Sequence, residues 1–77
     1  MLIKVKSLTG RELEFDMGAT DKVFLLKGKI EEKIGIAPVQ QRLLFNGRPM
    51  QDEKSFQEQN VSAGSVVHLV LALRGGF

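Results

Sequence analysis

The end of the chain carries the residues with the clearest chemical potential, in the order Leu71-Ala72-Leu73-Arg74-Gly75-Gly76-Phe77. Gly75 and Gly76 lack a Cβ atom, so they can pass through a narrow channel, and their large conformational entropy opposes any fixed structure. From Leu73 to Gly76 an extended chain reaches roughly 13 Å. A carboxylate on such a tail can enter another protein's active site while the folded domain stays outside. The alternative is a frayed chain end, which is the usual explanation for two terminal glycines alone.

An enzyme would need other residues, and the chain of 77 residues lacks them. It has one histidine, His68, no cysteine, no glycine-rich phosphate loop and no metal-ligand spacing, so we expect no catalytic residue, metal or cofactor. The net charge is +2, but Lys and Glu alternate and five Phe are the only aromatic residues, which disfavours nucleic-acid binding. The sequence also has no membrane-span pattern and no signal-peptide layout.

Residues 1–17 alternate between apolar and charged side chains, with the period of two that marks strands with one buried face. A three-residue loop at 8–10, with Gly10 where a positive φ is needed, would join the two strands into a hairpin. The resulting register places Lys6 opposite Glu12 and stacks apolar side chains on the other face. Turn, charge pairs and apolar pairs therefore predict the same hairpin.

Residues 22–34 carry apolar side chains at helical spacing, and Gly35 follows as a common helix stop. The buried face of this helix would consist of Val23, Leu26, Ile30 and Ile34. We expect Thr20 and Asp21 to accept hydrogen bonds from the first free amides of the helix. Gly28 lies inside the helix and costs about 1 kcal/mol relative to alanine.

Apolar alternation predicts two further strands at about 40–45 and 66–72. A short edge strand is expected at 48–50, because a proline is tolerated at the edge of a sheet. A mixed sheet over one helix makes an α+β domain of residues 1–72. Residues 73–77 would be a flexible tail.

Several uncharged side chains should point outward from this sheet. Leu44, His68 and Val70 lie on the outer faces of their strands by alternation, and Leu8 is at the hairpin tip. Since the fold would bring them together, they could form a docking patch, although chance explains the pattern equally well. The rim of this patch would be formed by Arg42, Arg48 and Lys6, which favour acidic partners.

Lys27 and Asp52 are a further polar pair. Lys27 lies beside the apolar face of the helix, where a charged side chain needs a partner. We interpret the pair as structural, a half-buried ion pair that holds the loop at 51–60 against the helix.

Three motifs identify the chain as a member of the ubiquitin family: Lys-Ser-Leu-Thr-Gly at 6–10, Gln-Gln-Arg-Leu at 40–43 and His-Leu-Val-Leu-Ala-Leu-Arg-Gly-Gly at 68–76. The likeness covers residues 1–76 without gaps and implies a β-grasp fold, in which the sheet grips the helix. Within the family the chain most resembles the neddylation modifiers, also called the Rub type. Ala72 is the sharpest marker, because ubiquitin has an arginine there. The other marks of this branch are Glu12, Glu14, Glu31, Glu32, Glu53 and Lys54.

The resemblance also implies a pathway. A protease would remove Phe77, and an activating enzyme would use ATP to adenylate the carboxylate of Gly76 and take it as a thioester. A conjugating enzyme and a ligase would pass it to a lysine of a target, usually a cullin subunit of a ubiquitin ligase. The modifier would be a monomer in the cytoplasm and nucleus, with Gly75 and Gly76 as its conjugation site. The alternative is an unconjugated ubiquitin-like module that only binds proteins.

The family's apolar patches are present as well. The main patch would consist of Leu8, Leu44, His68 and Val70, and a second one of Ile36, Leu71 and Leu73. Ala72 would select the activating enzyme, because the neddylation enzyme can reject an arginine there by charge or bulk. The neighbours that share this role would be Leu71, Leu73 and Arg74.

Some positions depart from both relatives. An apolar strip on the exposed helix face would consist of Phe24, Leu25, Gly28 and Ile34, and it is either a lineage-specific contact or simple divergence. Gln59 stands where both relatives carry a tyrosine that braces its loop, so we expect a looser loop. Arg11, Arg48 and Ala63 stand where ubiquitin has lysines that it uses to build chains. Chains through Lys6, Lys27, Lys29 or Lys33 are possible, but we do not expect chain formation to be the main role.

Overall fold

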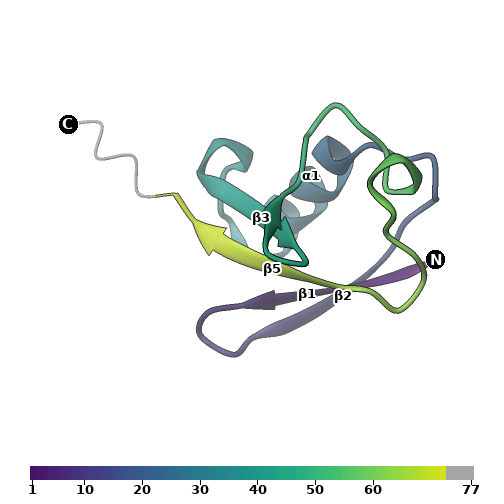
Figure 1. Cartoon of the computed structure of the whole chain (residues 1–77). Helices are drawn as coiled ribbons and strands as arrows, with labels where there is room; N and C mark the ends of the chain where they lie inside the picture. The colour runs from purple at the N-terminus through teal and green to yellow at the C-terminus, as the bar shows by residue number, and fades with distance from the viewer. Residues whose placement is uncertain (73–77) are drawn as a thin grey trace.

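A computed structural model describes residues 1–72 and shows a mixed sheet wrapped around one helix (Figure 1). The strands are β1 (Leu2–Ser7), β2 (Glu12–Asp16), β3 (Gln41–Phe45), β4 (Arg48–Pro49) and β5 (Val66–Leu71). Their order is β2-β1-β5-β3-β4. Among these described strands, only the neighbours β1 and β5 run parallel, and the other neighbouring pairs are antiparallel. This is the β-grasp arrangement, so the predicted fold class is confirmed.

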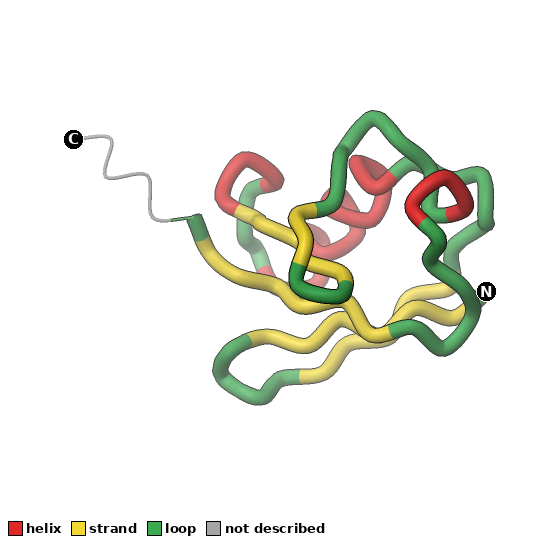
Figure 2. Tube along the Cα trace, viewed as in Figure 1, coloured by secondary structure: helices red, strands yellow, loops and turns green. Residues whose placement is uncertain are grey.

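The helices lie in the connections between β2 and β3 and between β4 and β5 (Figure 2). The long helix, α1 (Val23–Ile34), crosses the inner face of the sheet, and Gly35 ends it in the left-handed conformation with a φ of 77°. Two short 3-10 helices, η1 (Pro38–Gln40) and η2 (Gln57–Gln59), were not predicted. In the described part of the chain, no helix is long and apolar enough to cross a membrane.

The hairpin has the predicted register. Lys6 pairs with Glu12 and Val5 with Leu13, and Gly10 adopts a φ of 86° in the loop. The Lys6 ammonium lies 4.0 Å from the Glu12 carboxylate, but both side chains are about half exposed, so this ion pair contributes little to stability.

The core lies between the inner face of the sheet and α1. The inward positions of the central strands alternate with outward ones, as the period of two requires. The largest fully buried side chains are those of Phe56, Ile3, Met17, Leu26, Ile30, Leu43, Val5, Val23 and Val67. Burying each apolar side chain of this size stabilises the fold by roughly 1.5–3 kcal/mol, which offsets the entropy lost by a short chain.

The predicted capping of the first helical amides by Thr20 and Asp21 is wrong. Lys22 is the N-cap residue, and no side chain caps the helix. Instead, the amides of Val23 and Phe24 donate to the backbone carbonyls of Lys54 and Asp52, at 3.1 Å each. Asp21 accepts a hydrogen bond from the Gly18 amide at 2.7 Å. A loop distant in sequence therefore satisfies the amides that the local sequence was expected to satisfy.

The predicted strand ends are also slightly too long. The strand expected at 40–45 begins at Gln41, because Gln40 belongs to η1. The edge strand expected at 48–50 ends at Pro49, and the side chain of Met50 is buried in the core. The last strand ends at Leu71 rather than residue 72.

Candidate functional site

The base of the tail is fastened to the sheet. Leu71, the last residue of β5, pairs with Gln41 of β3, and the Ala72 amide donates to the Gln40 carbonyl at 2.8 Å. Ala72 is half-buried and Leu71 is exposed. The other predicted tail residues, Leu73, Arg74, Gly75, Gly76 and Phe77, lie outside the described residues.

The sheet register brings the predicted docking residues together on its outer face. His68 on β5 pairs with Leu44 on β3 and with Lys6 on β1, while Val70 pairs with Arg42. We call these five residues the outer patch. Leu44 and Val70 are half-buried, whereas the three polar side chains are exposed. The patch therefore combines an apolar centre with basic groups, which suits a partner with an apolar anchor and acidic neighbours.

Leu8, Arg48 and Ile36 are the remaining predicted docking residues. Arg48 is exposed on β4, where it pairs with Phe45 at the edge of the sheet. Leu8 and Ile36 line a separate groove of about 490 Å³ beside the hairpin loop. We call it the tail-side groove, because Leu71 at the base of the tail also lines it.

The tail-side groove is mostly apolar and includes residues, such as Leu13, that the sequence pattern assigned to no site. Its apolar lining residues are Val5, Leu8, Leu13, Ile34, Ile36, Leu69 and Leu71. Leu13 and Ile34 pack only partly against the core, so they leave apolar surface in the groove. The signal for Leu13 was its inward place in the strand alternation. That pattern cannot show that the helix leaves the side chain partly uncovered.

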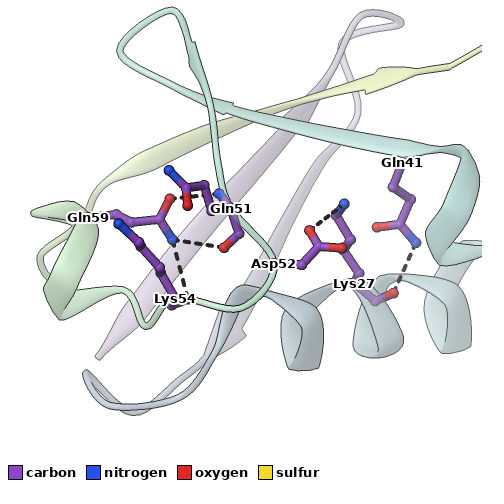
Figure 3. A network of polar contacts seen from close by, with 6 residues as sticks. All are labelled: Lys27, Gln41, Gln51, Asp52, Lys54 and Gln59. Atoms are coloured by element: carbon purple, nitrogen blue, oxygen red, sulfur yellow. Dashed lines mark hydrogen bonds and ion pairs between the residues drawn. The ribbon is translucent and has the colours of Figure 1, made fainter.

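The predicted ion pair between Lys27 and Asp52 is present (Figure 3). Their charged atoms lie 2.7 Å apart, with the Lys27 side chain 10% exposed and that of Asp52 48% exposed. Beside them, the buried amide of Gln41 donates to the backbone carbonyls of Lys27 at 2.9 Å and Ile36 at 2.8 Å. The 51–54 loop, α1 and β3 are thus held together by polar contacts at one place.

Gln59 braces its loop through hydrogen bonds, and a looser loop than one held by a tyrosine stays a prediction. Its side-chain oxygen accepts from the Gln51 amide at 2.8 Å, and its nitrogen donates to the Gln51 carbonyl at 3.1 Å (Figure 3). The same nitrogen lies 3.3 Å from the Lys54 carbonyl. A glutamine amide can both donate and accept, so it holds this backbone without an aromatic ring.

Only part of the expected apolar strip on the helix is present. Phe24 and Leu25 are exposed, and Gly28, one helical turn after Phe24, is partly covered. Ile34 instead packs against the core, because it lies on the same helix face as Ile30. Its assignment to the exposed strip was therefore wrong.

The candidate chain lysines differ in accessibility. Lys6 and Lys33 are exposed and Lys29 is partly exposed, whereas Lys27 is buried in its ion pair. Within residues 1–72, no group of three or more His, Cys, Asp or Glu side chains is arranged to hold a metal ion.

Comparisons with known proteins agree with this geometry. The ubiquitin family model matches residues 3–74. The chain belongs to the ubiquitin family. It is 58% identical over 76 residues to the ubiquitin-like protein NEDD8 of Dictyostelium discoideum, covering 99% of both chains. It is 55% identical to ubiquitin-like protein 1 of Schizosaccharomyces pombe, covering 99% of this chain and 97% of that protein.

A third relative, the NEDD8-like protein RUB1 of Saccharomyces cerevisiae, is 43% identical over 99% of both chains. The match to NEDD8 and RUB proteins along nearly the whole chain makes this protein a NEDD8-like modifier and not an enzyme. The resemblance to the neddylation branch, which rested on Ala72 and a few glutamates, is therefore confirmed.

Proposed function

We propose that this modifier is joined to lysine side chains of target proteins through the carboxylate of Gly76, after removal of Phe77. The observation that carries the proposal is the sequence Leu73-Arg74-Gly75-Gly76, which directly follows a domain that NEDD8 proteins match along nearly its whole length. The hydrogen bond from Ala72 to Gln40 supports it, because the chain is fastened to the sheet up to the residue before this tail.

In the conjugation reaction this chain contributes only a free carboxylate. A Gly76 oxygen attacks the α-phosphorus of ATP and pyrophosphate leaves, which gives an acyl adenylate on the activating enzyme. A cysteine thiolate of that enzyme then displaces AMP and forms a thioester. After transfer to the conjugating enzyme, a lysine amine displaces the thiolate, loses a proton and forms an isopeptide bond. Phe77 prevents the first step, because its peptide bond occupies the Gly76 carbonyl, so hydrolysis of that bond has to come first.

The partners in this pathway are an activating enzyme, a conjugating enzyme, a ligase, a processing protease and target proteins. We propose cullins as the usual targets, and the cytoplasm and nucleus as the place of action. The outer patch and the tail-side groove offer these proteins two apolar surfaces, of which the first carries basic groups that can fix orientation.

Ala72 is proposed as the position that selects the activating enzyme. An enzyme built for ubiquitin can pair an acidic group with arginine at this place, whereas Ala72 leaves that group unpaired at the interface. Such an unpaired buried charge costs roughly 2–5 kcal/mol. Ala72→Arg should therefore let the ubiquitin activating enzyme form a thioester with this chain. Equal thioester yields for the two forms would contradict the role of Ala72.

The direct test is formation of a thioester on the activating enzyme. The chain ending at Gly76 is mixed with ATP and the NEDD8-type activating enzyme, and the adduct is followed on gels with and without a thiol reductant. We expect a reducible adduct with this form and none with the chain ending at Phe77. If the form ending at Gly76 gives no adduct while a NEDD8 control does, the protein is instead an unconjugated binding module.

A further inference from the structure

Val39 is an exposed apolar side chain that neither the core nor the two docking surfaces use. It lies in the middle of η1, and 75% of its surface is exposed. Among the large apolar side chains of residues 1–72, only Leu8 is more exposed, at 79%. A valine this open to water gains nothing from folding, so its apolar surface is available to a partner.

The position of Val39 connects it with the tail. Gln41 pairs with Leu71, and the next residues along the two segments are joined by the hydrogen bond from the Ala72 amide to the Gln40 carbonyl. Val39 therefore directly precedes the residue whose carbonyl holds the Ala72 amide. The four residues from Leu73 to Gly76 reach only roughly 13 Å when extended, so an enzyme that takes the Gly76 carboxylate has to approach η1 closely.

Three apolar side chains lie around the base of the tail. Val39 and Leu71 are exposed and Ala72 is half-buried, and the exposed polar side chains beside them are those of Gln40 and Arg42. We call the three apolar residues the exit surface. Through Leu71 it is continuous with the tail-side groove. An apolar surface on a partner would bury the exit surface favourably, whereas a charged or well-hydrated surface there would lose solvation without compensation.

We infer that the activating enzyme recognises Val39 together with Ala72, through an apolar surface beside the channel that receives the tail. This inference rests on the proposed function. The activating enzyme is the expected partner, because it is the first to choose among free modifiers that share the Gly-Gly end. Val39 acts as a specificity residue and takes no part in the chemistry at Gly76.

The test uses Val39→Ala and Val39→Asp in the chain ending at Gly76, with saturating ATP and the NEDD8-type activating enzyme. We expect Val39→Ala to lower kcat/KM for the modifier about 3- to 15-fold, since two methyl groups lose an apolar contact. Val39→Asp should lower it by about 100-fold or more. Both losses should lie in KM, with kcat unchanged, because the reacting carboxylate is untouched. Thermal unfolding should not change, because the side chain is exposed.

Val66 provides a matched control. It is also an exposed valine, at 39%, but it lies at the start of β5, the end of that strand opposite to Ala72. Val66→Ala and Val66→Asp should leave kcat/KM unchanged. If the Val66 variants lose as much activity as the Val39 variants, the loss is not specific and the inference is wrong.

The outcomes separate this inference from the proposed function. If the unsubstituted chain forms no thioester, the proposed function itself fails. If it forms a thioester and both Val39 variants match it in KM, the function stands and the role of Val39 is refuted. A loss confined to kcat, or a loss only in cleavage by the processing protease, would also refute it. Should Val39→Asp lower the melting temperature, the milder Val39→Ala decides.

Discussion

Removing the carboxylate of Asp52 tests how the loop at 51–54 is held against α1. Asp52→Ala leaves the ammonium of Lys27 without its partner at 2.7 Å, in a position where the lysine side chain is only 10% exposed. Breaking a fully buried pair costs about 3–5 kcal/mol, and an exposed pair is worth about 0.2–1 kcal/mol. Since 48% of the Asp52 side chain is exposed and water can partly replace it, we expect a loss of about 1–2.5 kcal/mol.

Lys27→Met is the matched variant, because it keeps the apolar stem and leaves Asp52 to be solvated by water. It should cost less than about 1 kcal/mol, and the double variant should be nearly as stable as Lys27→Met alone. Urea denaturation of all four proteins measures these free energies of unfolding, provided that the m-values agree. If the two single losses simply add in the double variant, the ion pair does not contribute and our account of this contact is wrong.

Three further substitutions test local features of the domain. Gln59→Ala should lower the free energy of unfolding by about 1–2 kcal/mol and speed amide exchange at Gln51, because the side-chain hydrogen bonds to the Gln51 backbone are lost. Unchanged exchange would argue against the brace. Gly28→Ala should raise the free energy of unfolding by about 0.5–1 kcal/mol, since an added Cβ meets nothing within 4 Å, and a loss of stability would contradict this. The Ser55 amide donates a hydrogen bond to the Glu58 carboxylate, and this bond, followed by one with the Ser55 side chain, lowers the pKa of Glu58 below its ordinary value of 4.5. The contact therefore stabilises the fold above about pH 4.5, and this stabilisation is lost as the pH falls further. Glu58→Gln should flatten that acid dependence in urea midpoints measured from pH 7 to 3, and an unchanged slope would refute the assignment.

The sequence predicted the features that are set by neighbouring residues. The hairpin was found with its register because the loop at Gly10, the pair Lys6 and Glu12 and the apolar alternation all lie within 17 residues. The end of α1 at Gly35 was equally local, since a glycine directly after the apolar pattern commonly ends a helix.

The features that were missed depend on residues far apart in the chain. The first amides of α1 are satisfied by the carbonyls of Asp52 and Lys54, which no capping pattern near residue 20 can reveal. Gln59 braces its loop because its amide happens to reach Gln51.

The candidate site was predicted unevenly for the same reason. Alternation placed Leu44, His68 and Val70 outward, and the sheet register then brought them together as expected. The tail-side groove was not visible in any pattern, because it is formed by the hairpin, the helix and β5 together. The importance of Gly75-Gly76 came from the likeness to the family, since two glycines alone have no specific meaning.

The most direct test of the central claim is mass spectrometry of a target protein after a complete reaction. The chain ending at Gly76 is incubated with ATP, purified NEDD8-type activating and conjugating enzymes, a ligase and a cullin, with no other modifier present. Trypsin cleaves after Arg74, so conjugation should leave Gly75-Gly76 attached to a cullin lysine through an isopeptide bond. A cullin without any such lysine, in a reaction where a NEDD8 control modifies it, would contradict the account.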